Sequence, residues 1–495
     1  MAKGSILMVL LRLLSRSIGL VGTIVLARLL APEEFGLVAL AMVVVGGFEV
    51  AGHFGAGFAL IRDQDAGRVE YDTAWTLQVV RGAIQGAALG LMAPFAAAFL
   101  GDARLHDIFL AFAVMFALVG FRNIGIVDFR KHLSFAPLIK LRAYSQLGAF
   151  AASIAVAVIW KSHWALIVGV LTERGLHAAL SYVVHPYRPT FCLQAWRKLL
   201  QFTKWVGFNN VLAYLNGRTD VFVLSRFVGA DVVGYYSVAK RVSNMTTSEI
   251  TQPASQTLLP GFAKVAHDFD RLSTLYLSSL SAILFIGLPI AVGIFVLGDL
   301  IVQVVLGEKW LAAVPLLKVL AIYGIVRSSA GGAFSLMLVL GRPAAVTAVA
   351  VARFAVLVAL LLWVLPAAGP IGVAWAVVTA ATVGLFLNSA VIARVCGFSV
   401  MRVIAATWRT AVSAAVMAAV LSACHEQWPA AASSLGLLAQ LAALVALGVA
   451  IYLLTCVALW GLSRFPDGTE RQVVSLVDHG IARLSTALQG RRPAA

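Results

Sequence analysis

The stretch IGLVGTIVLARLLAPEEFGLVALA, residues 18–41, decides the fold. An apolar run is interrupted by the acidic turn Pro32-Glu33-Glu34, and a second apolar run follows at once. Because an apolar segment of about 20 residues spans a bilayer as a helix, we read the end of one membrane helix and the start of the next.

This stretch returns about 198 residues later in the range 221–239, VFVLSRFVGADVVGYYSVA. Internal repeats of this kind are typical of transporters that are built from two bundles and move their substrate between them. The repeat therefore predicts two pseudo-symmetric halves. The matching pairs are Leu26 and Leu224, Arg28 and Arg226, Glu33 and Asp231, Gly36 and Gly234, and Ala41 and Ala239.

Composition indicates a membrane protein rather than a soluble enzyme. The 495 residues are 61% hydrophobic and 12% charged, whereas a soluble domain has about 25% charged residues. Arginines at 12, 16 and 28 interrupt the first apolar run, so we interpret it as a mature helix and not as a signal peptide. The four cysteines are scattered, which favours neither a disulfide framework nor a zinc site. We expect no metal and no cofactor.

Hydropathy predicts an all-α polytopic protein with about 14 transmembrane helices: two six-helix bundles followed by two further helices. The predicted parts are an N-terminal bundle (1–190), a C-terminal bundle (191–396), two extra helices (397–463) and a cytoplasmic amphipathic tail (464–495). Basic residues gather in the connectors of one side, so the positive-inside rule places both termini in the cytoplasm.

The net charge of +16 has two parts. Most of it lies in connectors, where it sets topology and contacts anionic lipid. Nucleic-acid binding is not expected, because the chain has no soluble basic domain. The rest lies inside spans. Lys240 and Arg241 are about 9 residues into a helix, or ~13 Å deep, where a charge costs at least ~2.5–3.5 kcal/mol.

Arg327, Arg353 and the pair Arg218/Asp220 are similarly deep. Buried ion pairs explain part of this charge, for example Asp220 with Arg218 or with Lys240. Acidic residues at this depth are too few to neutralise all the cations. A net positive interior predicts an anionic substrate, and arginine binds phosphate through two parallel hydrogen bonds.

Cations within about two turns of a helix end have a simpler explanation, because their side chains can reach the headgroups. We interpret Arg81, Arg122, Lys140 and Arg142 in this way. Arg12, Arg28 and Arg226 can act as anchors or as substrate contacts. The candidate substrate-binding set is Arg12, Arg16, Arg28, Arg218, Arg226, Lys240, Arg241, Arg327 and Arg353.

Acidic residues within spans are candidates for ion coupling. Glu49 and His53 lie one turn apart, and Glu249 occupies nearly the equivalent place in the second half. A carboxylate beside an imidazole can carry coupling protons, although a hydrogen bond between helices explains the pair equally well. The candidate set is Glu49, His53, Asp220 and Glu249.

The motifs ARLLAPEEFGLVALA (27–41), DVVGYYSVAKRVS (231–243), LGEKWLAAVPLLKVLAIYG (306–324) and LGRP (340–343) resemble the polysaccharide transporter branch of the Wzx-type oligosaccharide flippases. These share a superfamily with the multidrug MATE antiporters and the lipid II flippase MurJ. The resemblance implies two six-helix bundles, a cationic central cavity and no enzymatic activity. It also implies transfer of undecaprenyl-diphosphate-linked oligosaccharide across the bacterial inner membrane. A polysaccharide polymerase and chain-length proteins are implied partners.

Three alternatives remain. A lipid II flippase is the nearest, because charge alone does not distinguish it. A MATE-like exporter of cations predicts an acidic cavity, whereas the interior charge here is basic. A membrane polymerase or ligase requires a sizeable outer loop with acid–base groups, and the predicted outer loops are short.

Overall fold

The computed structural model describes the chain at residues 18–19, 21–51, 60, 63, 65–132, 134, 136–197, 203–397, 400–428 and 433–463. These residues form helices and connectors, and none of them is in a β-strand. They divide into two compact units, one from Met1–Val238 with Val305–Trp310, the other from Ala239–Val304 with Leu311–Ala495. The prediction of an all-helical membrane protein is confirmed.

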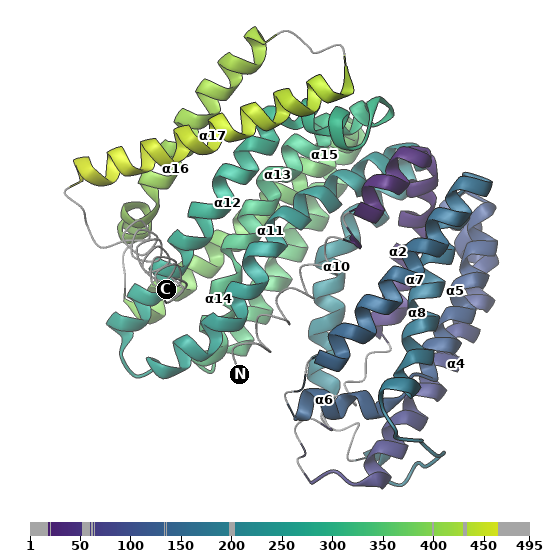
Figure 1. Cartoon of the computed structure of the whole chain (residues 1–495). Coiled ribbons are helices and arrows are strands. Elements are labelled where there is room, and N and C mark those ends of the chain that lie inside the picture. Colours follow the sequence, from purple (N-terminus) through teal and green to yellow (C-terminus); the bar gives the residue numbers. More distant parts are fainter. Residues whose placement is uncertain are drawn as a thin grey trace, which may run out of the picture. The chain divides into compact units, whose positions relative to one another are not determined.

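The first unit is drawn from purple to teal in Figure 1. Residues 21–29 are helical and are followed by α2 (Pro32–Ala51), α4 (Arg68–Leu100), α5 (Arg104–Gly120), the short η1 (Ile124–Ile126), α6 (Val127–Lys131), α7 (Ala136–Trp160), α8 (Trp164–Val184) and α10 (Thr203–Phe227). Helix α4 packs on α5, α7 on α8, α5 on α8 and α2 on α10.

The second unit contains the longest helices. Helix α11 (Ala230–Lys264) begins in the first unit and continues into the second. The helices that follow are α12 (Phe269–Val305), η2 (Glu308–Ala313), α13 (Val314–Ser329), α14 (Gly331–Val339), α15 (Pro343–Cys396), α16 (Val400–Gln427) and α17 (Ser434–Leu462). Gly369 breaks α15 into two helices, within the turn predicted at 366–370.

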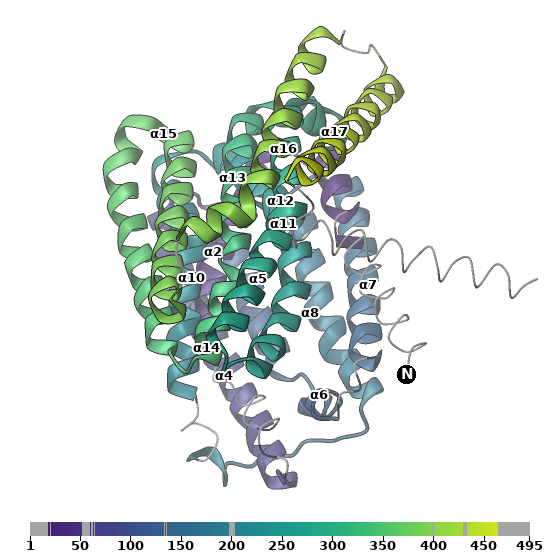
Figure 2. The ribbon, with the colours of Figure 1, turned by 90° about the vertical axis from the view of Figure 1, so that its left-hand side faces the viewer.

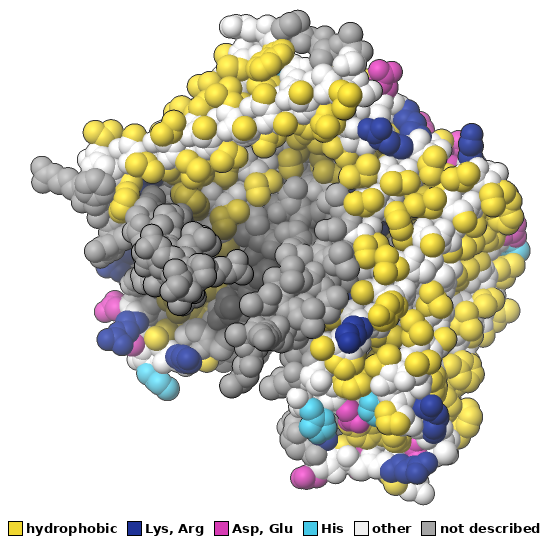
Figure 3. All heavy atoms as spheres, in the orientation of Figure 1, with side chains coloured by type: hydrophobic (Ala, Val, Ile, Leu, Met, Phe, Trp, Pro, Cys, Tyr) yellow, Lys and Arg dark blue, Asp and Glu magenta, His cyan; other side chains and the backbone are white. Residues whose placement is uncertain are grey.

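Eight described helices are long and apolar enough to cross a membrane, or nine if the bent pair α5 and η1–α6 is one span. On the face shown in Figure 3, hydrophobic side chains cover the sides of the helices and most charged side chains lie near helix ends. Helix α8 has 21 residues but is not one of the eight, and Glu173, Arg174 and His177 interrupt its apolar run. The predicted total of 14 spans stays a prediction.

Glycines bring α4 and α5 into close contact. A Cβ atom on Gly82 would lie 2.5 Å from the Phe116 carbonyl oxygen, and one on Gly86 would lie 2.6 Å from that of Ala113. Two glycines four residues apart let neighbouring backbones approach, as in many membrane helix pairs. The end of α5 is therefore fixed against α4 where the chain bends.

The chain bends by 71° after α5, at residues 121–123. Helix C-termini leave carbonyl groups without helical partners. The Nε2 amide of the buried Gln78 donates to the carbonyls of Gly120 and Arg122, both at 2.9 Å. The Asn123 side chain accepts a hydrogen bond from Gly125 N at 2.9 Å. These hydrogen bonds therefore hold the backbone of Arg122 at a fixed position in the bend.

The connector after α8 is fastened to the start of α4. The buried Asp72 carboxylate accepts hydrogen bonds from Tyr187 Oη at 2.8 Å, from Thr190 N at 2.8 Å and from Thr190 Oγ1 at 2.7 Å. Burial, together with the hydrogen bond to Asp72, raises the pKa of Tyr187. The Asn123 Nδ2 group donates to Tyr187 O at 2.8 Å. Residues 185–192 thus belong structurally to the first unit.

We expect Asp72→Ala to lower the free energy of unfolding by about 3 kcal/mol, because the hydrogen bonds to a buried carboxylate lose their acceptor. The melting temperature of the purified protein in detergent measures the effect. Asp65→Ala, at an exposed acidic position in the preceding connector, is the matched control. Equal melting temperatures for the two variants would contradict the fastening role.

In the second unit, the helix pair α16–α17 packs on α12. The Ser281 hydroxyl donates to Ala406 O at 2.6 Å, and the Tyr452 hydroxyl donates to Phe285 O at 2.8 Å. Near the other end of α12, Asp299 Oδ2 lies 2.9 Å from His425 Nε2. Figure 2 shows α16 and α17 beside the end of α12. The last two described helices are therefore attached along much of α12.

Candidate functional site

The two copies of the internal repeat meet at their glycines. A Cβ on Gly36 would lie 1.6 Å from Ala230 O, and a Cβ on Gly234 would lie 2.0 Å from Pro32 O. Real Cβ atoms essentially never come within 3.0 Å of such a neighbour. The first turns of α2 and α11 therefore touch backbone to backbone, in a reciprocal contact that we call the glycine crossing.

Trp310 lies in the same part of the first unit. Its side chain is fully buried, and its indole Nε1 donates to Ala27 O at 2.9 Å. The ring makes edge contacts with Phe35 at 5.3 Å and with Tyr235 at 5.9 Å between ring centroids. Three of the recognised sequence motifs thus converge on one tryptophan.

The neighbouring Lys309 caps the helix that precedes the acidic turn. Its Nζ donates to the carbonyl oxygens of Arg28, at 2.9 Å, and of Leu30. In return, Arg28 Nε donates to Val305 O at 3.2 Å. A cation at a helix C-terminus satisfies free carbonyls and complements the helix dipole. The segment 305–310 is therefore fixed to the helix of residues 21–29.

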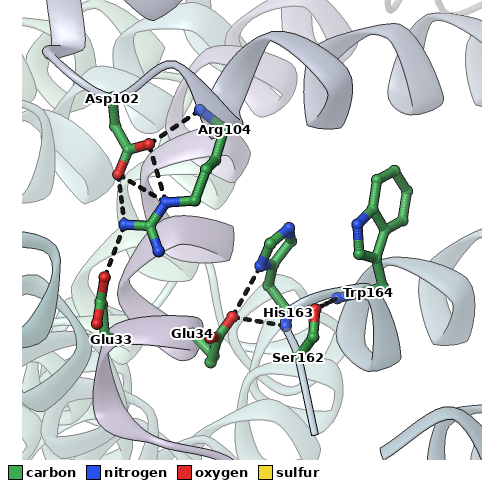
Figure 4. A network of polar contacts seen from close by, with 7 residues as sticks. All are labelled: Glu33, Glu34, Asp102, Arg104, Ser162, His163 and Trp164. Atoms are coloured by element: carbon green, nitrogen blue, oxygen red, sulfur yellow. Dashed lines mark hydrogen bonds and ion pairs between the residues drawn. The ribbon is translucent and has the colours of Figure 1, made fainter. Parts of the chain in front are cut away.

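The acidic turn is tied to two other connectors, as Figure 4 shows. Arg104 forms ion pairs with Glu33 Oε1 at 2.6 Å and with Asp102 Oδ2 at 2.7 Å. Glu34 Oε2 lies 2.7 Å from His163 Nδ1 and accepts from His163 N at 2.6 Å. Hydrogen bonds from Arg104 hold the pKa of Asp102 below its usual value. These contacts hold the α2 end of the glycine crossing in place.

A second feature of the first unit is a set of five arginines and one histidine, which we call the basic cluster. Arg122 lies within electrostatic range of Arg81, Arg130 and Arg174. His177 lies within range of Arg122, Arg174, Arg142 and Arg130. The basic cluster comprises Arg81 of α4, Arg122 of the bend, Arg130 of α6, Arg142 of α7, and Arg174 and His177 of α8.

One acidic side chain lies among these cations. Glu49, near the end of α2, forms an ion pair with Arg174 at 3.1 Å between Oε1 and Nη2. Its charge also acts on Arg81 and Arg122. Arg174 is the eleventh of the 21 residues of α8, so it lies ~15 Å from the start of the helix, near mid-membrane depth. The cluster is therefore positive, with Arg174 at its deepest point on α8, and an anion is its natural ligand.

The second unit carries cations of its own. Arg327 Nη1 donates to Asn244 Oδ1 at 2.9 Å, which joins α13 to α11. Arg327 is also within electrostatic range of Arg353 on α15. The Arg353 side chain lies over Gly384, where a Cβ would meet its Cδ at 2.9 Å. On α11, Lys240 is buried and Arg241 is exposed. Arg327 and Arg353, two predicted site residues, are thus close together.

The other predicted residues are either outside the described part of the chain or on other elements. Arg12, Arg16 and His53 lie outside the described residues, as does the side chain of Glu249. Asp220 is buried and accepts a hydrogen bond from Tyr236 Oη at 2.5 Å. Three predicted cations have exposed side chains on the first unit: Arg28, Arg218 and Arg226. The roles predicted for all of these residues stay predictions.

Sequence reasoning missed Arg174 and His177 and assigned Arg81, Arg122 and Arg142 to headgroup anchoring. The depth criterion that selected Lys240 would have selected Arg174, because it lies at the centre of the predicted span 164–184. His177 follows at i+3 on the same helix face. Arg122 had no comparable signal, because the apolar stretches on both sides of Arg122 and Asn123 are read from sequence as one continuous span.

Comparison with known proteins identifies relatives for most of the chain. A family model described as "Polysaccharide biosynthesis protein" matches residues 25–315. The lipopolysaccharide biosynthesis protein WzxC of Escherichia coli K12 is 26% identical over 66% of this chain and 67% of its own length. The teichuronic acid biosynthesis protein TuaB of Bacillus subtilis is 25% identical over 58% of this chain and 60% of its own length.

Among solved structures, the lipid II flippase MurJ in an inward closed conformation has the same fold. It superposes with a TM-score of 0.74 at 16% identity, covering 92% of this chain and 99% of that one. At this level of identity the likeness describes the fold and leaves the substrate open.

Proposed function

Because this chain belongs to the polysaccharide biosynthesis protein family and is a membrane transporter, we propose that it flips undecaprenyl-diphosphate-linked oligosaccharide repeat units across the bacterial inner membrane. The flipped units serve surface polysaccharide assembly. A polymerase and chain-length proteins are the proposed downstream partners.

The observation that carries this proposal is the basic cluster. Its Arg174 lies halfway along α8, where a charge is costly unless a partner or a wet cavity stabilises it. Diphosphate supplies that partner, since arginine pairs with phosphate oxygens through two parallel hydrogen bonds.

We propose that transport proceeds by alternating access, with the glycine crossing on the periplasmic side. This orientation follows from the positive-inside rule, which places the connector 185–200 in the cytoplasm and the acidic turn at 32–34 outside. Opening toward the periplasm then requires the two repeat turns to separate. The substrate must bind one state better than the other to drive that change.

A lipid II flippase remains the second candidate, because its substrate carries the same diphosphate. A cation exporter is disfavoured, because the basic cluster repels cations. Glu49, His53, Asp220 and Glu249 remain the proposed positions for ion coupling, and no particular ion is favoured.

We expect Arg174→Ala and Arg353→Ala each to reduce export of surface polysaccharide at least tenfold, since a charge-assisted contact to phosphate is worth about 1.5–3 kcal/mol. Polysaccharide is quantified on cells that lack the chromosomal gene, with membrane levels of each variant measured in parallel. Arg197→Ala is the matched control, because it removes one positive charge from the exposed connector. Wild-type export by both variants at normal membrane levels would refute the cationic site.

The same assay applied to Arg241→Ala tests the predicted site on α11. Lipid II transfer is tested separately by cell viability after depletion of the host's own lipid II flippase. Rescue of growth by this chain would favour the second candidate over the first.

A further inference from the structure

We propose that Glu49 is an internal stand-in for the substrate's phosphate: its carboxylate occupies the basic cluster in the empty transporter and is displaced when the diphosphate binds. This inference rests on the proposed function and assigns a specific role to one residue of that site. Glu49 was predicted only as a candidate for proton coupling with His53.

The geometry of the pair points to this role. The Glu49 carboxylate lies 3.1 Å from Arg174 Nη2, and its charge reaches Arg81 and Arg122 as well. A carboxylate and a phosphate present the same kind of oxygen acceptors to a guanidinium group, so each can take the other's place. Glu49 therefore occupies the position that an incoming phosphate requires.

The pair is accessible enough to be exchanged. The Arg174 side chain is 39% exposed and that of Glu49 is 30% exposed within the chain. A fully buried ion pair is costly to break, because one partner is left without compensation. At this exposure, an anion can approach Arg174 while the Glu49 carboxylate turns toward water or toward other cations of the cluster.

Charge balance explains why a transporter benefits from such a residue. An empty cluster with only cations would be destabilised by mutual repulsion and by desolvation at mid-membrane depth. Glu49 lowers that cost in the empty state, in which the protein must reset without substrate. It also weakens substrate binding, which allows release on the far side of the membrane.

Binding of inorganic pyrophosphate tests the proposal on the full-length protein in lipid nanodiscs, by isothermal titration calorimetry. We expect Glu49→Gln to bind pyrophosphate about fivefold more tightly than the wild type, as the competing carboxylate is gone. Glu49→Asp, which keeps the charge, should bind like the wild type. Each variant is first checked for a wild-type melting temperature.

Glu173→Gln is the matched control for charge. It makes the same change in net charge one residue from Arg174, but adjacent helical residues do not share a face. If Glu173→Gln tightens pyrophosphate binding as much as Glu49→Gln does, the gain in affinity comes from the change in net charge alone, and the stand-in role is refuted. In an Arg174→Gln background, Glu49→Gln should change affinity by less than twofold, because the two side chains act as one unit.

The outcomes separate this inference from the proposed function. Equal affinities of Glu49→Gln and wild type would overturn the stand-in role and leave the diphosphate site intact. The double variant Arg122→Gln/Arg174→Gln should bind pyrophosphate more weakly than both the wild type and Glu49→Gln. If all three proteins bind it equally, the proposed diphosphate site is refuted.

Discussion

Replacing Gly36 with alanine is expected to reduce polysaccharide export at least tenfold, and Gly234→Ala is expected to do the same. The added methyl group would lie 1.6 Å from Ala230 O in the first variant and 2.0 Å from Pro32 O in the second. Neither backbone can yield by a rotamer change, so the two turns must move apart by more than 1 Å. Overpacking of a close contact costs about 1–3 kcal/mol; two backbones that cannot yield put these variants in the upper half of that range, where the effect on the population of the closed contact is tenfold or more.

Export by cells is again the measurement, and proteolysis of the acidic turn in spheroplasts reports on its opening on the proposed periplasmic side. Gly217→Ala on α10 is the control, because a Cβ there meets no atom within 4 Å. Export by Gly36→Ala at the level of Gly217→Ala would mean that the glycine crossing is dispensable for transport.

Trp310→Ala should destabilise the first unit by about 3–5 kcal/mol, the usual cost of deleting a fully buried tryptophan side chain. The variant loses the edge contacts with Phe35 and Tyr235 and the hydrogen bond to Ala27 O. Thermal unfolding in detergent measures the loss, and export is expected to fall with it.

Trp310→Phe separates packing from hydrogen bonding. It keeps an aromatic ring in the same space but has no N–H group, so it should cost only about 1 kcal/mol. If Trp310→Ala melts at the wild-type temperature, the convergence of the three motifs has no energetic importance.

The repeat shows how far sequence reasoning extends. It predicted that Gly36 and Gly234 are equivalent positions, and the structure shows that they touch. Their equivalence follows from aligning the two copies of the repeat. Their contact depends on how the first turns of α2 and α11 pack, and no local sequence pattern predicts that packing. Lys309 and Trp310 were likewise recognised as part of a motif. Their partners are backbone carbonyls about 280 residues away, and a carbonyl carries no sequence signal.

The cations show a different limit. Depth along a helix is readable from sequence, and it identified Arg327 and Arg353, which the structure brings together. Depth also would have identified Arg174. Arg122 required knowledge of the bend that Gln78 and Asn123 stabilise. The predicted neighbour of Glu49 on its own helix, His53, lies outside the described residues, and the structure adds Arg174 on α8 as a partner.

The segment Val305–Trp310 belongs to the first unit, although both helices that it joins lie mainly in the second. The polypeptide consequently passes from one unit to the other three times, at residues 238, 304 and 310. Each of these three passages lies within a helix: the first in α11, the second in α12 and the third in η2.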